Sequence, residues 1–257
     1  MTPLGRGELM FDGLGVALVS LFDDDGRLLL EQTAELAARL AAHGVRSVTI
    51  AGTTGEPWRL DAEQRLALVG ACRRMLPPGV PVFVGCGHPQ QDDAVRLTRA
   101  LKQSGADALL ALSPAGVRDC RPYYDAVAQA AGDVPVIGYH FPLIAPPGVA
   151  LEHLPDLPIA ALKDSSADAD RLVATLAIFD RPLLVGSAAY LALAGPLGAS
   201  GAILALANVE PERCAAAFAG DMAAQRELLD AHLRSLENFP HGLKAMLATE
   251  SAWSQAL

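Results

Sequence analysis

The sequence predicts a (β/α)8 barrel, an α/β fold in which parallel strands alternate with helices. Three observations lead to this prediction. The chain has 257 residues, of which 51% are hydrophobic, so one large domain can bury a sizeable core. Eight short apolar runs alternate with longer segments of helical period, which is typical of a TIM barrel. No glycine fingerprint follows the first run, which disfavours an open doubly wound sheet.

Each predicted strand is a short apolar run, as expected for parallel strands that are covered on both faces. In chain order, the runs span residues 14–21, 47–51, 82–86, 108–112, 134–139, 159–162, 183–185 and 201–206. Helices are expected between them at residues 33–42, 61–75, 91–104, 122–131 and 168–178. Asp61 has the position of an N-cap for the second of these helices.

The C-terminal part is expected to close or extend the barrel with helices at residues 211–218, 222–236 and 243–249. We therefore predict a single barrel domain over residues 1–257, with its strands within about 13–206 and a short helical extension in 210–257. Residues 250–257 carry no clear structural signal.

Composition excludes several function classes. The formal charge of −9 is spread along the chain, so neither nucleic acid nor an anionic membrane is an expected partner. The N-terminus lacks the apolar core of a signal peptide, and no run of 18 apolar residues occurs, so we expect a cytoplasmic protein. No CxxC pair or ligand spacing suggests a disulfide framework or a metal site among Cys72, Cys86, Cys120, Cys214, His43, His153, His232 and His241.

A lysine closes the sixth apolar run and is the first candidate for catalysis. The chain has only three lysines among its 20 basic residues, Lys102, Lys163 and Lys244, so ordinary surface charge is supplied by arginine. Arginine stays protonated and cannot form an imine, whereas a desolvated lysine becomes a nucleophile. Lys163 therefore suggests amine chemistry, although a lysine that snorkels from a strand end is an equally good interpretation.

Strand alternation places a tyrosine beside this lysine. Tyr139 is the last inward residue of the fifth run, and Lys163 is the last inward residue of the sixth. Neighbouring strands lie about 4.8 Å apart, so the two side chains are expected to meet at one mouth of the barrel. Active sites of this fold lie at the carboxyl ends of the strands.

Other strand ends carry polar residues. The second run ends in a Gly-Thr-Thr-Gly-Glu segment that begins at Gly52. Its glycines allow the backbone amides to approach a carboxylate, although a tight loop with solvated threonines is the alternative. Ser165 and Ser187 could bind substrate hydroxyls or cap the following helices. His88 could line the mouth, whereas His140 and Asp164 should point away from the barrel interior.

Three segments together resemble the dihydrodipicolinate synthase / N-acetylneuraminate lyase family. They are Gly-Thr-Thr-Gly-Glu at residues 52–56, Tyr-His-Phe-Pro at 139–142 and Lys-Asp-Ser at 163–165. The likeness runs from about Leu14 to about Met246. Members of this family are (β/α)8 lyases of the class I aldolase type, which bind pyruvate or another 2-oxo acid as a Schiff base.

The resemblance implies a role for each matched residue. Lys163 would form the imine, Tyr139 would move protons at the reacting carbon, and Thr53 and Thr54 would hold the substrate carboxylate, together with the loop amides, that of Gly55 included. Because a phenol with a pKa of roughly 10 needs a positioned partner to pass its proton, Thr53 is also the candidate relay. No cofactor is implied, and a homo-oligomer, dimer or tetramer, is expected.

Departures from the family pattern narrow the expected activity. Synthases of the family tend to have a tyrosine where this chain has Ala115, and an arginine for a second substrate carboxylate where it has Leu143 and Ile144. Dihydrodipicolinate synthesis is therefore disfavoured. An aldolase acting on a pyruvate-type 2-oxo acid, such as a 2-keto-3-deoxy sugar acid, is preferred.

Three other functions stay open. A dehydratase or hydratase would use the same imine, and a non-catalytic 2-oxo-acid-binding homologue is prompted by the missing tyrosine at Ala115. A phosphate-binding barrel isomerase is prompted by the Gly-Ala-Ser-Gly segment at residues 198–201 near the eighth run.

Overall fold

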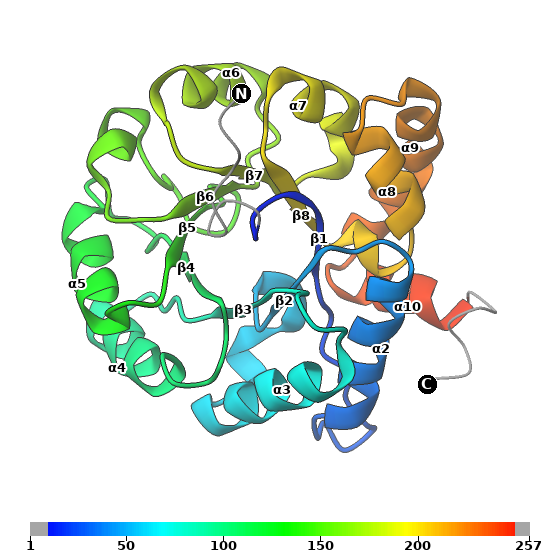
Figure 1. Cartoon of the computed structure of the whole chain (residues 1–257), viewed down its shortest axis with the longest axis horizontal. Helices are drawn as coiled ribbons and strands as arrows, with labels where there is room; N and C mark the ends of the chain where they lie inside the picture. Colours follow the sequence, from blue (N-terminus) through cyan, green and yellow to red (C-terminus); the bar gives the residue numbers. More distant parts are fainter. Residues whose placement is uncertain (1–9, 250–257) are drawn as a thin grey trace.

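The computed structural model describes residues 10–249 and confirms the predicted fold. Its strands form one closed, all-parallel barrel in chain order, as Figure 1 shows. They are β1 Gly13–Ala17, β2 Ser47–Ile50, β3 Val82–Gly85, β4 Ala108–Leu112, β5 Val136–His140, β6 Ala161–Asp164, β7 Leu183–Val185 and β8 Gly201–Leu204. Every strand overlaps its predicted apolar run.

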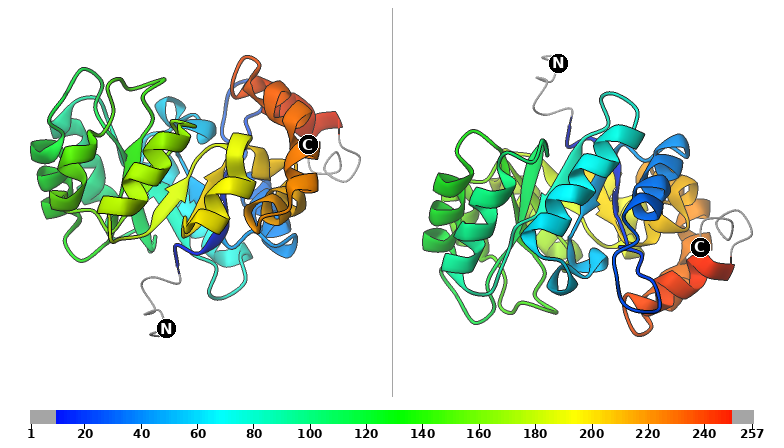
Figure 2. Two further views of the ribbon diagram at one scale, coloured as in Figure 1. Left: turned by 90° about the horizontal axis from the view of Figure 1, so that it is seen from above. Right: turned by 90° about the horizontal axis from the view of Figure 1, so that it is seen from below.

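Helices surround the barrel and follow the predicted order (Figure 1). They are α2 Leu30–Ala42, α3 Ala62–Met75, α4 Gln91–Leu101, α5 Arg121–Ala131, α6 Ala169–Ile178, α7 Leu191–Leu197, α8 Pro211–Phe218, α9 Met222–Leu236 and α10 His241–Thr249. Asp61 caps α3 as predicted, because its side chain accepts a hydrogen bond from the Gln64 N–H. The side views of Figure 2 show α9 and α10, in orange and red, together at one end of the molecule.

Some boundaries differ from the prediction. The first strand ends at Ala17, although the apolar run continues to residue 21, because the Val19 N–H donates to the Asn208 side chain instead of to a strand. Helix α2 begins three residues earlier than predicted, at Leu30. Helix α7 is absent from the prediction, and its seven residues include Pro196, which weakens the helical signal.

Two apolar layers stabilise the barrel. The outer layer lies between the strands and the surrounding helices. The inner layer fills the barrel itself and includes Phe11, Phe83, Leu110, Ile137 and Ile203. The rings of Phe11 and Phe83 lie 5.7 Å apart between centroids, so side chains fill the interior and leave room for a site only at a mouth.

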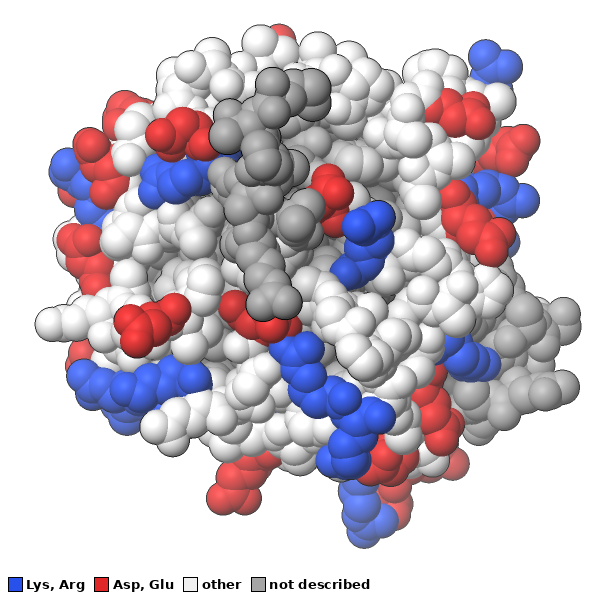
Figure 3. Space-filling view, viewed as in Figure 1, with Lys and Arg blue, Asp and Glu red and all other residues white. Residues whose placement is uncertain are grey.

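The surface carries mixed charge. On the face drawn in Figure 3, acidic and basic side chains are interspersed. Within residues 10–249, no helix combines the length and the apolar character that a membrane crossing requires. The single domain over residues 1–257 stays a prediction. The N-terminal segment up to residue 9 and residues 250–257, to which the sequence assigns no signal peptide and no clear structure, lie outside the described residues.

Candidate active site

A cavity of about 530 Å³ opens at the carboxyl ends of β5 to β8 and of β2. This volume is typical of small-molecule sites. Six of the seven predicted site residues line it, namely Thr53, Thr54, Tyr139, Lys163, Ser165 and Ser187. They come from four different strand ends, so the closure of the barrel is what brings them together.

Lys163 lies at the base of this cavity and is only 3% exposed. It is the register partner of Tyr139 across β5 and β6, as strand alternation predicts. Its Nζ lies 4.3 Å from the centroid of the Tyr139 ring. Lys163 has no acidic partner within the described residues, and no other residue lining the cavity is an arginine, a lysine or an acid. An isolated amine in a buried cavity is suited to attack a carbonyl carbon.

Neighbouring groups hold the tyrosine in position. The Tyr139 N–H donates to the Tyr124 hydroxyl at 3.2 Å, and that hydroxyl donates to the Ala111 carbonyl at 3.1 Å. The ring of Tyr139 stacks on that of Phe141 with centroids 5.9 Å apart. These contacts fix the backbone and the ring of Tyr139 and leave its hydroxyl available to a substrate.

The expected proton relay is not assembled in this structure. Thr53 and Tyr139 line the same cavity, yet no hydrogen bond joins their hydroxyls anywhere in residues 10–249. A substrate or water that bridges the two hydroxyls would be needed for Thr53 to pass a proton. The relay stays a prediction.

A hydrogen-bond network outside the cavity connects the ends of β5 and β6. Asp164 accepts a hydrogen bond from the Arg171 Nε at 2.7 Å and from the Ser166 N–H at 2.8 Å, so it braces the loop after β6. The Arg171 Nη2 donates to the Val149 carbonyl, and the Val149 N–H donates to the His140 Nδ1 at 2.9 Å. Burial lowers the pKa of His140 to about 4. His140 and Asp164 thus point away from the barrel interior, as predicted.

The serines of the cavity differ in their hydrogen bonding. Ser187 caps the turn that follows β7, because its Oγ accepts from the Ala189 N–H at 3.3 Å. The Oγ of Ser165 is buried and has no hydrogen-bond partner among the described groups. An unpaired buried hydroxyl costs free energy, and a bound ligand would supply its partner. Of the two serines, Ser165 is therefore the better candidate to bind substrate.

Gly55 is the predicted site residue that does not line the cavity. Its N–H donates to the Gly52 carbonyl at 2.9 Å within the turn Thr53–Gly55. Its carbonyl accepts from the Ser20 Oγ at 2.8 Å. Both backbone groups of Gly55 have partners within the protein, so the expectation that its amide binds the carboxylate stays a prediction that these contacts do not favour. Thr53 and Thr54 are the residues of this turn that line the cavity.

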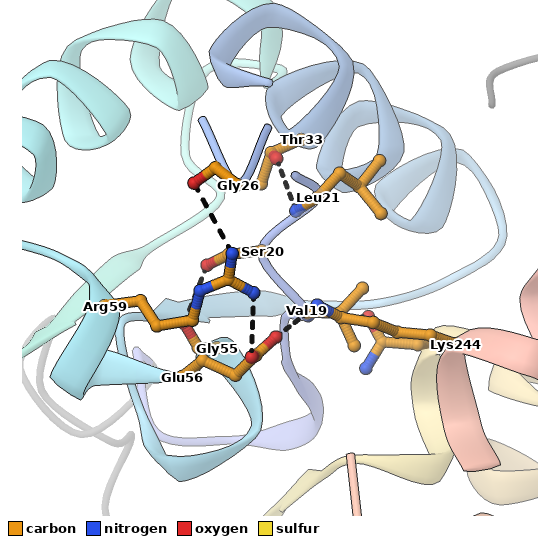
Figure 4. Close-up of polar contacts among 10 residues, drawn as sticks. Val19, Ser20, Leu21, Gly26, Thr33, Gly55, Glu56, Arg59 and Lys244 are labelled. Carbon is orange, nitrogen blue, oxygen red and sulfur yellow. Dashed lines mark hydrogen bonds and ion pairs between the residues drawn. The ribbon is translucent and has the colours of Figure 1, made fainter. Parts of the chain in front are cut away.

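An ion cluster anchors this turn to the C-terminal helix α10 (Figure 4). The buried Glu56 pairs with Lys244 and, at 3.2 Å, with the Arg59 Nη1. Burial raises the pKa of the Glu56 carboxyl, but Lys244 and Arg59 outweigh it and leave this pKa below its usual value. Glu56 adopts a left-handed backbone with φ 51°, a conformation that persists in a non-glycine residue only where its surroundings fix it. The cluster thus fixes Glu56, the residue that follows the turn Thr53–Gly55.

The far side of the cavity comes from segments that the sequence analysis did not assign to the site. The loop after β5 contributes Phe141, Leu143 and Ile144, and the end of α9 contributes His232 and Leu236. Burial lowers the pKa of His232, so its imidazole is neutral at pH 7. The periodicity of α9 predicts a helix but does not say which residues face a cavity.

Other candidates lie elsewhere. His88 does not line the cavity, and its Nδ1 lies 3.4 Å from Asp93.

Gly198 precedes β8, so the segment at residues 198–201 lies at the opposite end of the barrel, and the phosphate-site hypothesis loses its basis. Among residues 10–249, no group of three or more His, Cys, Asp or Glu side chains is placed to hold a metal ion.

A family model described as the dihydrodipicolinate synthetase family matches residues 10–249. The chain belongs to this family. A 4-hydroxy-tetrahydrodipicolinate synthase from Pseudomonas aeruginosa is 31% identical over 86% of this chain and 80% of its own length. Another synthase of this name, from Corynebacterium aurimucosum, is 32% identical over 85% of this chain and 76% of its own length. The structure of the chloride-inhibited dihydrodipicolinate synthase from Acinetobacter baumannii, complexed with pyruvate, is similar with a TM-score of 0.84 at 26% identity, over 91% of this chain and 87% of that chain.

Membership in the dihydrodipicolinate synthetase family makes the departures in this chain informative. Ala115 is exposed and does not line the cavity. Leu143 and Ile144 do line it. This wall therefore presents apolar side chains, which offer no countercharge to a second substrate carboxylate.

Proposed function

We propose that the chain is a lyase of the class I aldolase type that binds a pyruvate-type 2-oxo acid through Lys163. The buried amine of Lys163 at the base of the cavity, against the Tyr139 ring, is the observation that carries this proposal. The relatives of this chain are named as synthases, so the proposal that the chain is an enzyme is consistent with its family. The pyruvate in the Acinetobacter baumannii structure supports a 2-oxo acid as the first substrate.

The proposed chemistry begins with attack of the Lys163 amine on the C2 carbonyl of the 2-oxo acid. Loss of water leaves an imine, whose protonated form withdraws electrons from C3. A proton then leaves C3 to give an enamine, whose electron pair forms a C–C bond to the carbonyl carbon of an aldehyde. Hydrolysis of the product imine restores the amine, and cleavage runs through the same steps in reverse.

Two further groups would act on this intermediate. The Tyr139 hydroxyl has no hydrogen-bond partner within residues 10–249, and Tyr139 lines the cavity, so it is the group that would exchange protons with the substrate oxygen or C3. Thr54, with Thr53, would hold the carboxylate and orient the carbonyl toward Lys163. A dehydratase would use the same imine and enamine, but would expel water from C4 instead of breaking a C–C bond.

Synthesis of a dihydrodipicolinate remains the less favoured activity, although relatives carry that name. No arginine lines the cavity within residues 10–249, so a second carboxylate would lack a cationic partner. A non-catalytic 2-oxo-acid-binding homologue is the second candidate, and the alanine at position 115 is the observation that favours it. The homo-oligomer stays a proposal, which sedimentation would measure.

Borohydride trapping tests the proposal. Incubation with pyruvate and borohydride should add one reduced adduct, which peptide mass spectrometry should locate at Lys163. Lys163→Arg keeps the charge but cannot form the imine and should give no adduct, whereas Lys102→Arg changes an exposed lysine and should be labelled normally. No adduct across a panel of 2-oxo acids would refute the proposal. An adduct without cleavage or condensation of any partner would favour the non-catalytic homologue.

A further inference from the structure

We infer that the aldehyde handled by this site is uncharged and apolar, with an aliphatic or aromatic chain, instead of a sugar-derived aldehyde or one that carries a second carboxylate. This inference rests on the proposed function and deepens it, because it concerns the half of the cavity that lies beyond the imine. Four features of that half carry it: its walls, its polar groups, its charge and its exposed rim.

The first wall is the loop that follows β5. Phe141, Pro142, Leu143 and Ile144 all line the cavity, so four consecutive residues offer carbon surface and no side-chain hydrogen-bond donor or acceptor. This loop begins two residues beyond Tyr139, and the Phe141 ring stacks on the Tyr139 ring. The apolar wall is therefore continuous with the reacting centre.

The second wall comes from the C-terminal part of the chain. Leu236 at the end of α9, Phe239 and Leu206 after β8 line the cavity. Hydroxyl groups of a substrate that were placed against either wall would lose water without gaining a partner, which is unfavourable. An alkyl or aryl chain in the same place would bury apolar surface.

Polar groups are few on this side. Ser235 donates its hydroxyl proton to the His232 carbonyl in its own helix. The His232 imidazole has no partner within residues 10–249 and lines the cavity. One imidazole can serve one oxygen, such as the oxygen of a single carbonyl or hydroxyl. A chain of several hydroxyls would need more partners than α9 and the loop after β5 provide.

Charge is also absent from this side. Among the described residues that line the cavity, Lys163 is the one lysine, and there is no arginine and no acid. Lys163 is committed to the imine in the proposed mechanism. A carboxylate on the aldehyde would therefore enter an apolar pocket without a countercharge, which is strongly unfavourable.

The rim of the cavity exposes large apolar side chains. Leu143 is 83% exposed, Leu236 53% and Ile144 44%, although all three line the cavity. Exposed residues of this size that gather at a cavity mark a binding surface. The chain of an apolar aldehyde, seated between the loop after β5 and the end of α9, would cover them.

Three four-carbon aldehydes test the inference with carbon number held constant. Butanal is apolar, erythrose carries three further hydroxyls, and succinic semialdehyde carries a carboxylate. Each is added to the full-length protein at fixed, saturating pyruvate, and the initial rate of pyruvate consumption gives kcat/KM for the aldehyde. Lys163→Ala supplies the background rate. We expect kcat/KM for butanal to exceed that for either polar aldehyde at least tenfold, and benzaldehyde to be accepted.

A substitution at the rim of the cavity provides a second test of the inference. Ile144→Arg places a cation at the apolar wall and should raise the ratio of kcat/KM for succinic semialdehyde to that for butanal at least tenfold. Leu197→Arg makes the same kind of change at an exposed leucine of α7 that does not line the cavity, and should leave the ratio unchanged.

The outcomes separate this inference from the proposed function. If pyruvate labels Lys163 but erythrose or succinic semialdehyde is preferred, or no aldehyde is consumed, the inference is overturned and the imine assignment stands. If no 2-oxo acid labels Lys163, both are overturned. Labelling together with a preference for butanal and benzaldehyde supports both.

Discussion

The Nζ of Lys163 lies 4.3 Å from the centroid of the Tyr139 ring, because the two residues are register partners on neighbouring parallel strands. The amine therefore faces the ring of the tyrosine. An amine above an aromatic face is favoured when it carries a proton, and its lone pair becomes available once the proton leaves. A substrate that enters between the threonine loop and Tyr139 would meet both groups from the same side of the barrel.

Tyr139→Phe should separate imine formation from proton transfer. The Tyr139 hydroxyl has no hydrogen-bond partner within residues 10–249, so its removal should change the free energy of unfolding by less than about 0.5 kcal/mol. Labelling of Lys163 by pyruvate and borohydride should persist, whereas kcat should fall by roughly 10²–10⁴ because the general acid–base is lost. Tyr123→Phe, at a buried tyrosine outside the cavity, is the matched control. An unchanged kcat in Tyr139→Phe would remove Tyr139 from the proposed mechanism.

Ser165→Ala should affect stability and activity in opposite directions. The Ser165 Oγ is buried without a partner, so its removal should raise the free energy of unfolding by about 1 kcal/mol, as measured by urea denaturation. The same change should lower kcat/KM about tenfold if this hydroxyl binds substrate.

Ser166→Ala is the comparison for this prediction. The Ser166 Oγ accepts a hydrogen bond from the Asp168 N–H at 3.2 Å, so the variant should be less stable by roughly 0.5–1 kcal/mol. Equal loss of stability in both serine variants would show that Ser165 has a partner that this structure does not reveal.

Lys244→Met should destabilise the fold through Glu56. Among the described residues, the buried Glu56 carboxylate would keep Arg59 alone as a cationic partner, and leaving a buried charge partly unpaired should cost about 1–3 kcal/mol. Because Glu56 follows the threonine turn, KM for pyruvate should also rise.

A double-mutant cycle isolates this interaction. Glu56→Gln with Lys244→Met removes both charges, so the double variant should be less destabilised than the sum of the single variants by about 1 kcal/mol or more. Additive effects, measured by urea denaturation, would mean that the pair in Figure 4 contributes no net stability.

The sequence was sufficient to predict the barrel and to predict which residues at the strand ends line the cavity. The strands are short and apolar, and strand alternation identifies the last inward residue of each one, so Tyr139 and Lys163 could be paired from the sequence. Helix α7 was missed because Gly195 and Pro196 interrupt its seven residues. Residues 18–21 were assigned to the first strand because Leu18, Val19 and Leu21 continue its apolar character, although only the Leu18 N–H among them donates to β2, at the Thr49 carbonyl, and the Val19 N–H donates to Asn208.

The far half of the cavity could not be predicted from local pattern. His232 and Leu236 lie about 70 residues beyond Lys163, and the periodicity of α9 does not indicate which of its faces turns toward the barrel mouth. That choice depends on how α9 packs against α8 and the loop after β8, which is a tertiary property. Gly55 was assigned to the carboxylate site because glycine permits close approach, whereas its N–H donates to Gly52 within the turn and its carbonyl accepts from Ser20, which only the tertiary structure reveals.

The pH dependence of stability should reveal the buried His140. Burial lowers its pKa to about 4, and Arg171 adds to this effect while Asp164 opposes it, whereas the pKa of an unfolded histidine is about 6.5. Between these values the unfolded chain binds a proton that the folded chain does not, so this residue makes stability fall as pH falls. Its contribution between pH 7 and pH 5 should be about 2 kcal/mol.

His140→Asn should remove that part of the pH dependence, because asparagine can still accept a hydrogen bond from the Val149 N–H but does not titrate. Urea denaturation at several pH values from 7 to 5 should give a shallower loss of unfolding free energy for the variant than for the wild type. His241→Asn, at an exposed histidine, controls for the loss of an imidazole and should follow the wild type. Parallel curves for the wild type and His140→Asn would mean that His140 binds a proton as readily in the folded protein as in the unfolded chain, so that the packing of β5 and β6 around it tolerates a charge.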